Sequence, residues 1–393
     1  MSPTRAFTPV QLGSLNLEHR IALAPLSRFR NVPDKQKPTD LAAEYYGQRA
    51  SKGAFLLTET TFISREAGGY RDAPAIHSQE QIDAWRKVTT AVHDKGAFIF
   101  SQLNAAGRAN YPDCGAPLLP DVKTVGPSPI GLSSTSRPIE LSLDDIKRYI
   151  SQYNQAALNA QAAGFDGVEI QAANGYLIDQ FMSSHSNIRR DAYGGSLENR
   201  TRFLLEAVGA AVHALGEKRV GVRLSQGMGE TNPYELFEFV VRRLVETFPT
   251  LAYIHLVEPR ARGWTPEAPT TAALAAGIKA SNDRFRAIIR GVDPDVVGDD
   301  ETFVFDEPSI QRPTLVLAAG GFNSDNVEAH VKRTGDVVSF GRYFIANPDL
   351  PARIKHSVKL NHYERETFYS GGDEGPANGY TDYPFADELQ GKI

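Results

Sequence analysis

Short apolar runs, each ended by polar or turn-forming residues, recur along the whole chain. Most of them are apolar at nearly every position, which is typical of parallel strands buried on both faces. Eight such runs are expected as strands: residues 21–26, 54–59, 97–103, 167–170, 220–224, 252–258, 314–319 and 337–340.

Helical patterns lie between these runs. The clearest spans 144–163 and follows Ser142, with Asp145 three residues later, which predicts a capping box. A second spans 197–215, with apolar residues at helical spacing. Eight strands that alternate with helices predict an α/β fold of the (β/α)₈ TIM-barrel type. A doubly wound sheet is the alternative, but no Gly-x-Gly-x-x-Gly follows the first strand.

Two segments exceed a minimal barrel. Residues 105–138, rich in Gly, Pro and Ser, follow the third strand and are expected to form a lid or subdomain over the barrel mouth. Residues 275–312 carry an acidic cluster and are expected as a surface insertion before the seventh strand. No linker or repeat divides the chain, so we expect one domain spanning residues 1–393.

Composition narrows the class of protein. The chain of 393 residues is 41% apolar, enough for a core of this size, and its net charge of −5 offers no basic field for nucleic acid or an acidic membrane. A single cysteine and the lack of a long apolar run favour a reducing compartment and no membrane span. No His, Cys and carboxylate cluster has metal-ligand spacing. We expect a cytoplasmic enzyme for a small molecule, either monomer or homodimer.

Polar residues and glycines collect at the ends of the predicted strands, where a TIM barrel forms its active site. They are Ser27, Thr60, Gln102, Asn104, Gln171, Asn174, Arg223, Gly320, Gly321, Gly341 and Arg342. The glycines and the arginine after the last two strands suit a phosphate, because glycine lets the backbone approach an anion and a guanidinium can clamp it. The alternative is that the glycines only turn the chain and the arginine is a surface ion.

The stretch 168–181 is the most informative, because Gln171, Asn174 and Tyr176 place three hydrogen-bonding side chains where an apolar strand gives way to a loop. His185-Ser186-Asn187 and the segment 190–200 (Arg-Asp-Ala-Tyr-Gly-Gly-Ser-Leu-Glu-Asn-Arg) follow. Together these segments closely resemble the Old Yellow Enzyme family of FMN-dependent ene-reductases, and the resemblance spans nearly the whole chain. One departure is that the family usually has a histidine where this chain has Gln171.

The resemblance implies tightly bound, non-covalent FMN, with NADPH as the reductant. The FMN phosphate would lie at Gly320, Gly321, Gly341 and Arg342. The isoalloxazine ring of FMN would be bordered by Pro25, Leu26, Ser27, Thr60, Gln102 and Arg223. The Ser27 hydroxyl would bond near N5, Gln102 would hold the pyrimidine edge, and Arg223 would stabilise negative charge near N1. An ion pair inside the barrel is the alternative for Arg223. Two segments, Arg28-Phe29-Arg30 and Arg260-Ala261-Arg262, are weak candidates for a 2′-phosphate contact.

The implied reaction reduces a carbon–carbon double bond conjugated to a carbonyl or nitro group. Gln171 and Asn174 would bind the activating oxygen, and Tyr176 would protonate the α-carbon. Asn104, where many relatives have tryptophan, is expected to contact substrate. Trp264 and Tyr369 match positions of substrate-stacking rings, with core packing as an equal alternative for each. Together, Gln171 and Asn104 favour a specialised substrate, such as a secondary metabolite.

Three other functions stay open on the sequence. A redox-neutral isomerase or cyclase is motivated by Gln171 and Asn104. A catalytically silent flavin-binding protein is disfavoured by the retained Tyr176 and Asn174. A cofactor-free hydrolase would use paired carboxylates, for instance Glu59 and Glu169.

Overall fold

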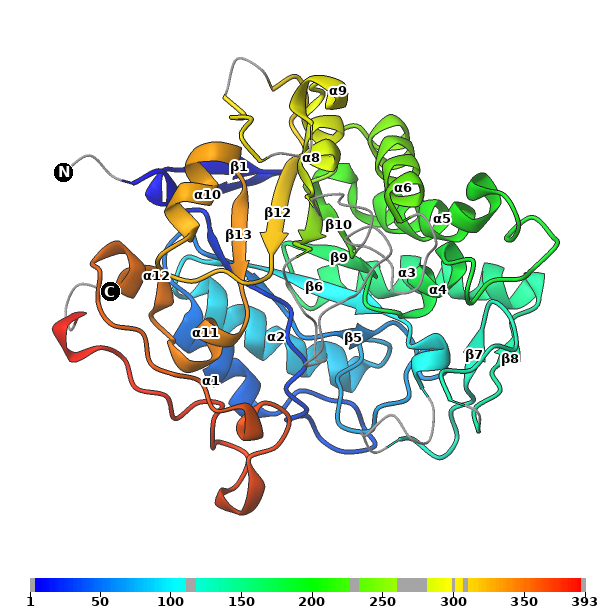
Figure 1. The fold of residues 1–393 in the computed structure, drawn as a ribbon. Coiled ribbons are helices and arrows are strands. Elements are labelled where there is room, and N and C mark those ends of the chain that lie inside the picture. Colours follow the sequence, from blue (N-terminus) through cyan, green and yellow to red (C-terminus); the bar gives the residue numbers. More distant parts are fainter. Residues whose placement is uncertain are drawn as a thin grey trace.

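Eight parallel strands close into a barrel in the computed structural model, which describes residues 4–110, 118–133, 135–225, 233–259, 281–298, 301–306 and 310–389 (Figure 1). In chain order they are β3 (Ile21–Leu23), β4 (Phe55–Leu57), β6 (Phe98–Asn104), β9 (Gly167–Ala172), β10 (Val220–Leu224), β11 (Tyr253–Val257), β12 (Leu315–Ala319) and β13 (Val337–Phe340). The ring closes because β13 pairs with β3, and β4 pairs with both β3 and β6. The predicted (β/α)₈ barrel is confirmed.

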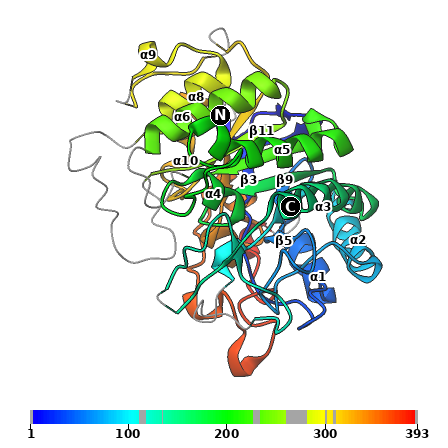
Figure 2. The ribbon, with the colours of Figure 1, turned by 90° about the vertical axis from the view of Figure 1, so that its right-hand side faces the viewer.

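Helices cover the outside of the barrel, as Figure 2 shows for α3, α5 and α6. They are α1 (Asp40–Arg49), α2 (Gln79–His93), α3 (Leu143–Ala162), α4 (Leu177–Met182), α5 (Leu197–Leu215), α6 (Pro233–Thr247), α8 (Asp283–Arg290), α9 (Pro294–Val297), α10 (Val327–Thr334), α11 (Arg342–Ala346) and α12 (Leu350–Lys355). The predicted capping box at α3 is confirmed, because Ser142 and Asp145 exchange side-chain and backbone hydrogen bonds. The structure also confirms the predicted helix at 197–215.

The end of the barrel where the strands begin is filled. An antiparallel hairpin of β1 (Val10–Leu12) and β2 (Leu15–Leu17) buries its leucines against interior side chains that include Phe55, Phe100 and Tyr253. In Figure 1 the arrowheads of β12 and β13 point away from this hairpin. The carboxyl ends of the strands are therefore left as the place for a site.

The two extra segments differ in how they join the barrel. In the predicted lid, β7 (Val125–Gly126) pairs with β8 (Ile139–Glu140), which directly follows the lid. Outside this segment, a short strand β5 (Thr61–Phe62) extends the sheet beside β6. In the predicted insertion, α8 is a buried helix of the barrel wall, packed against α6. The expectation of a surface insertion is therefore wrong for α8, and among the described residues of this segment only those after α8 depart from the barrel plan. Within the described residues, no helix is long and apolar enough to cross a membrane.

Candidate active site

Two strand boundaries differ from the prediction in a way that defines the site. Strand β9 continues to Ala172, so Gln171 lies inside the barrel wall instead of in the following loop. Strand β3 ends at Leu23, so Pro25, Leu26 and Ser27 form the loop beyond it. Pro25 is buried, whereas Leu26 and Ser27 are half-buried.

The turn after β9 is held in one shape by local hydrogen bonds. Asn174 adopts a left-handed backbone with φ of 59°, which asparagine tolerates better than most residues, and its N–H donates to Ser225 Oγ at 2.9 Å. The N–H of Gly175 donates to Asp179 Oδ2 at 2.7 Å. Tyr176 then caps α4 and is half-buried, and the side chain of Asn174 is exposed. The turn thus presents an amide and a phenol close to the end of β9.

Strand register aligns further polar groups with this turn. Arg223 of β10 is paired with Gln171 of β9 on one side and with His255 of β11 on the other. Burial lowers the pKa of the Arg223 guanidinium, and the carboxylate of Glu169 and the phenol of Tyr176 oppose that shift. Arg223 is therefore within electrostatic reach of the proposed proton donor.

Three side chains near the ends of β6, β9 and β10 carry buried polar atoms without a hydrogen-bond partner in the part of the chain that the structure describes. They are Oε1 of Gln171, Nε of Arg223 and both side-chain polar atoms of Asn104. Gln171 is 2% exposed and Asn104 is 0% exposed. An unpaired buried polar group costs about 1–3 kcal/mol, so a cluster of them is expected where a ligand supplies the partners.

A continuous chain of hydrogen bonds crosses the barrel interior beside this cluster. Thr60 Oγ1 donates to Gln102 Oε1 at 2.8 Å, and Gln102 Nε2 donates to Glu169 Oε1 at 2.7 Å. The other carboxylate oxygen of Glu169 lies 2.7 Å from His255 Nδ1, and His255 Nε2 lies 3.0 Å from Ser339 Oγ. Sequence reasoning placed Thr60 and Gln102 here and treated His255 as a satisfied barrel residue. It missed Ser339 and the link through Glu169.

The predicted phosphate loops lie next to each other, because β12 and β13 are neighbours in the barrel. Gly320 and Gly321 both have positive φ, 116° and 68°, which a larger residue would adopt only with strain. A Cβ added at Gly341 would lie 3.2 Å from a methyl carbon of Leu26, so glycine also allows the β3 loop to approach. Arg342 is exposed. The four predicted phosphate residues thus lie on two adjacent loops, and Leu26 of the β3 loop lies close to one of them.

Arginines 28 and 30 hold the C-terminal segment instead of facing a ligand. The buried Arg28 guanidinium donates to the carbonyls of Phe368 and Gly379 at 3.0 and 2.6 Å. The Arg30 guanidinium donates to the carbonyls of Pro376 and Thr367. Most donors of the two guanidinium groups are therefore used within the fold, although Nη1 of Arg28 is buried without a hydrogen-bond partner among the described residues. These contacts give no support to the suggested 2′-phosphate contact, and Arg260 and Arg262 lie outside the described residues.

The remaining predicted substrate contacts are placed less fully. Tyr369 is 55% exposed, and its ring centroid lies 5.7 Å from that of Phe29 in the β3 loop. Trp264 lies outside the described residues. Among those residues, no group of His, Cys, Asp and Glu has the arrangement of a metal site.

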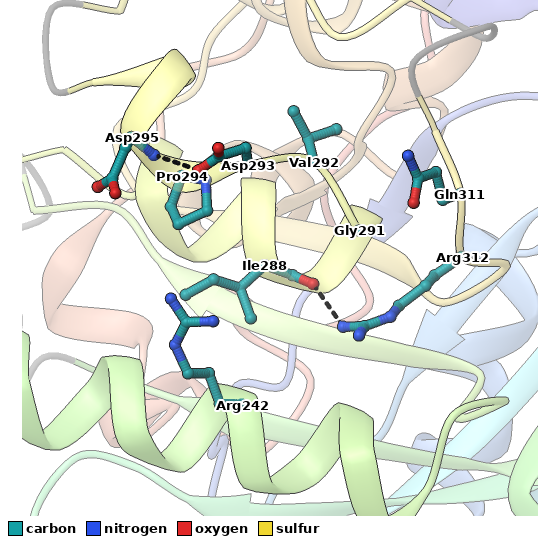
Figure 3. Close-up of a pocket in the computed structure, with 9 residues that line it drawn as sticks. All are labelled: Arg242, Ile288, Gly291, Val292, Asp293, Pro294, Asp295, Gln311 and Arg312. Atoms are coloured by element: carbon teal, nitrogen blue, oxygen red, sulfur yellow. Dashed lines mark hydrogen bonds between the residues drawn. The ribbon is translucent and has the colours of Figure 1, made fainter.

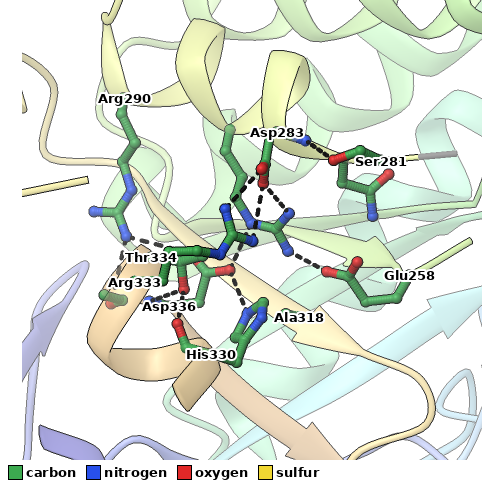
Figure 4. A network of polar contacts seen from close by, with 12 residues as sticks. Glu258, Ser281, Asp283, Arg290, Ala318, His330, Arg333, Thr334 and Asp336 are labelled. Carbon is green, nitrogen blue, oxygen red and sulfur yellow. Dashed lines mark hydrogen bonds and ion pairs between the residues drawn. The ribbon is translucent and has the colours of Figure 1, made fainter. Parts of the chain in front are cut away.

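Two other polar features lie apart from this cluster. A surface pocket of about 450 Å³ is bounded by Arg242 of α6, Ile288 of α8 and Arg312, and no predicted site residue lines it (Figure 3). A buried ionic network joins Glu258, Asp283 and Asp336 near the end of β11 (Figure 4). Neither contains a residue predicted for catalysis.

The carboxylate pair proposed for a hydrolase is engaged in the fold. Glu59 is 1% exposed and accepts hydrogen bonds from the backbone N–H of Arg28 at 3.0 Å and from Asn31 Nδ2 at 3.2 Å. One carboxylate oxygen of Glu169 is bonded to Gln102 and the other to His255. This geometry disfavours the hydrolase alternative, since neither carboxylate is left for a substrate.

Known proteins match the chain over nearly its whole length. Residues 5–285 match the NADH:flavin oxidoreductase / NADH oxidase family. The chain is 39% identical to a chanoclavine-I aldehyde reductase of Penicillium roqueforti, covering 99% of each. It is 40% identical to a probable inactive dehydrogenase of Claviceps fusiformis, covering 99% of this chain and 97% of the other. Among solved structures, morphinone reductase matches with a TM-score of 0.80 at 34% identity, covering 98% of this chain and 97% of that one.

The chain belongs to the NADH:flavin oxidoreductase / NADH oxidase family, and its resemblance to the Old Yellow Enzymes is confirmed. It is an oxidoreductase of that family, and membership implies a flavin cofactor and a nicotinamide reductant.

Proposed function

We propose that this family member is an FMN-dependent ene-reductase that acts on a carbon–carbon double bond conjugated to a carbonyl or nitro group, with NADPH as reductant. When bound, FMN would take a hydride from NADPH and deliver it to the β-carbon of the alkene. The chain's own residues would bind both partners, polarise the activating group and supply the proton.

One observation carries the proposal: the buried, unpartnered polar atoms of Asn104, Gln171 and Arg223 at the carboxyl ends of adjacent strands β6, β9 and β10. Buried polar atoms are normally paired, so three such side chains at the ends of adjacent strands fit a site whose missing partners come from a ligand. The donors among them are Nε of Arg223, which suits an electron-rich ring, and Nδ2 of Asn104, which suits a carbonyl or nitro oxygen. Oε1 of Gln171 and Oδ1 of Asn104 are acceptors. The residues at the barrel mouth therefore fit FMN and an activated alkene.

The substrate end would use the turn after β9. Gln171 and Asn174 would donate hydrogen bonds to the activating oxygen, where negative charge develops during reduction. The phenol of Tyr176 would protonate the α-carbon, because a group with an ordinary pKa near ~10 can still deliver a proton to a basic enolate carbon. The half-buried position of Tyr176 supports this role, since it leaves the phenol accessible to a bound substrate.

The cofactor end would use the strand ends and the glycine loops. Gln102 would hold the pyrimidine edge, Ser27 would bond the carbonyl near N5, and Arg223 would offset negative charge near N1. Pro25, Leu26 and Thr60 would border the ring. The phosphate would lie at Gly320, Gly321, Gly341 and Arg342, the first two of which have the positive φ that suits backbone N–H groups turned toward an anion.

The preference for NADPH rests on the family resemblance alone. Arg28 and Arg30 do not support it, because their guanidinium groups bond carbonyls of the C-terminal segment. We propose a cytoplasmic protein, monomeric or homodimeric, that acts on a small molecule.

The substrate is proposed to be a specialised, secondary-metabolite-like compound. Asn104 is smaller than the tryptophan that many relatives have there and carries two unsatisfied polar atoms, and Gln171 offers an amide in place of an imidazole. Two similar proteins are named for chanoclavine-I aldehyde and morphinone, which agrees with this class. Tyr369 and Trp264 would complete the substrate pocket.

A second candidate is favoured by the same glutamine. An amide cannot carry positive charge, and a similar protein is named a probable inactive dehydrogenase. A redox-neutral isomerase or cyclase, or a silent flavin-binding protein, would follow if Gln171 weakens the oxyanion site too far. Removing one oxyanion donor costs about 10²–10³ in kcat, so the outcome is measurable.

The test is an anaerobic mixing experiment on the purified holoprotein, with the visible flavin absorption as the signal. NADPH should bleach the band, and an activated alkene should restore it. A yellow protein that NADPH fails to bleach would overturn the reductase proposal and favour the second candidate. A protein that purifies without flavin and does not take up added FMN would overturn both.

Tyr176→Phe separates the two half-reactions. Bleaching by NADPH should keep its rate, whereas recovery with the alkene should slow by about 10²-fold or more, because only the second step needs the proton. Tyr383→Phe is the matched control, since the Tyr383 hydroxyl only accepts a hydrogen bond from the Glu364 N–H at 3.1 Å on the C-terminal segment. Equal recovery rates in the two variants would remove Tyr176 from the mechanism.

A further inference from the structure

A buried carboxylate sits behind the amide that would hold the flavin. Glu169 is 0% exposed and accepts from Gln102 Nε2 at 2.7 Å, and Gln102 Oε1 is bonded by Thr60 at 2.8 Å. An amide can be turned by 180° at little steric cost, which exchanges its donor and its acceptor. Here a hydroxyl donor on one side and a carboxylate acceptor on the other allow only one orientation. Glu169 thereby decides which way Gln102 presents its remaining N–H and lone pair.

The protonation states of His255 and Glu169 follow from their burial and from the groups that they contact. His255 is fully buried, and burial lowers its pKa despite the neighbouring Glu169, so the imidazole is neutral. Burial by itself would raise the pKa of Glu169, but His255, Arg223 and the Gln102 amide together bring it below its usual value. The carboxylate is therefore ionised, with His255 Nδ1–H donating to it. His255 Nε2 is then left to accept from the Ser339 hydroxyl at 3.0 Å, which is closer than the alternative acceptor of that hydroxyl, Ala318 O, at 3.4 Å.

This series of hydrogen-bonded residues also places a negative charge near the proposed flavin site. Glu169 carries a full negative charge in the barrel interior and acts directly on the Arg223 guanidinium. The neutral His255 does not cancel that charge, but its Nδ1–H draws electron density from the carboxylate. The field at the barrel mouth is thus a balance between Arg223, which favours an electron-rich ligand, and Glu169, which opposes one.

We propose that Glu169 is a positioning residue for the flavin, and that its charge, acting through Gln102 and against Arg223, lowers the reduction potential of the bound cofactor, while the Ser339–His255 pair moderates this effect by drawing electron density from the carboxylate. The inference rests on the proposed flavin site. It adds a role for three residues that do not themselves touch the substrate or the activating oxygen.

Two substitutions in the chain should move the potential in opposite directions. Glu169→Gln removes the negative charge and leaves Arg223 uncompensated, so reduced FMN should be favoured over oxidised FMN by about tenfold, which is about 30 mV upward for a two-electron couple. Ser339→Ala removes the donor to His255 Nε2. The Nδ1–H bond then weakens and more charge stays on Glu169, so the ratio should fall by about twofold.

Ser101→Ala is the matched control for Ser339→Ala. Ser101 is also a fully buried barrel serine, but its hydroxyl has no hydrogen-bond partner among the described residues. Its removal should leave the potential at the wild-type value. A general disturbance of the barrel would move the potential of both serine variants alike, whereas the proposed chain moves only one.

The experiment measures the two-electron potential of each flavin-loaded protein against a reference dye, together with the dissociation constant of oxidised FMN. Opposite shifts in Glu169→Gln and Ser339→Ala, with no shift in Ser101→Ala, are expected. If wild-type protein binds FMN and all variants share its potential, the chain has no such role and the flavin site itself stands. If wild-type protein does not bind FMN, both proposals fail. Should Glu169→Gln not fold, the two serine variants decide the question.

Discussion

The ionic network at the end of β11 gives a sharp stability prediction. Arg286 is 1% exposed and donates to three carboxylates: Glu258, Asp283 at 3.0 Å and Asp336 at 2.8 Å. Burial alone would raise the pKa of Asp336, but Arg286, helped by His330 and Arg290, holds it well below its usual value. Arg286→Met keeps much of the side-chain volume and removes the charge that these carboxylates share.

The expected cost follows from the burial of the network. Removing one partner of a buried ion pair costs about 3–5 kcal/mol, because an uncompensated charge stays behind. Arg290 and Arg333 remain near Asp336 and Asp283, at 3.7 and 2.6 Å, so the lower half of that range applies. With about 2.1 cal/mol/K of unfolding entropy per residue, a chain of 393 residues loses roughly 4–5 °C in Tm.

Thermal and urea unfolding of both proteins would measure the loss, with Arg242→Met as the matched control. Among the described residues, Arg242 forms its ion pair only with Glu238 one helical turn away, and its side chain is 45% exposed, so its loss should cost under about 1 kcal/mol. Equal Tm values for wild type and Arg286→Met, or equal losses in the two variants, would refute the reasoning that burial makes this network costly to break.

Three further predictions concern the site, the pH response and the barrel interior. Gln171→His should raise kcat/KM on simple enones by about 10²-fold if the amide is the weaker oxyanion donor, and an unchanged value in steady-state assays would exclude that explanation. Burial lowers the pKa of His19 to about 4 from 6.5, so the unfolded chain binds a proton at this residue more tightly than the folded chain does. The free energy of unfolding is therefore undiminished above pH 6.5 and falls as the pH drops toward 4. His19→Gln should remove roughly 3 kcal/mol of that pH dependence in unfolding titrations, and an unaltered dependence would place its origin elsewhere. Gly221→Ala would bring a Cβ to 2.3 Å from the Tyr253 ring and should cost about 1–3 kcal/mol, whereas Gly209→Ala on α5, with its nearest contact at 3.5 Å, should be neutral or stabilising in the same urea titration.

The sequence by itself was enough to predict the barrel and the starts of helices, because both depend on the order of residues over short stretches of the chain. A strand buried on both faces must be apolar throughout, and the capping box at Ser142 needs only a residue three positions later. The polar residues at the strand ends could also be recognised in the sequence, since amide side chains directly follow buried apolar runs. The exact ends of the strands differed, as at Gln171, which lies inside β9, and the buried helix α8 lies in a segment expected as a surface insertion.

Tertiary structure alone decided which of those residues meet. Glu169 bonds Gln102 across 67 positions and His255 across 86, and no local spacing encodes such contacts. They depend on the register of parallel strands, which is set by the whole ring. Arg28 shows the same limit: its donors reach carbonyls some 340 positions away, which turned an apparent ligand contact into a tether for the C-terminal segment. Local pattern determines which groups are buried, and the closed barrel determines which partners they find there.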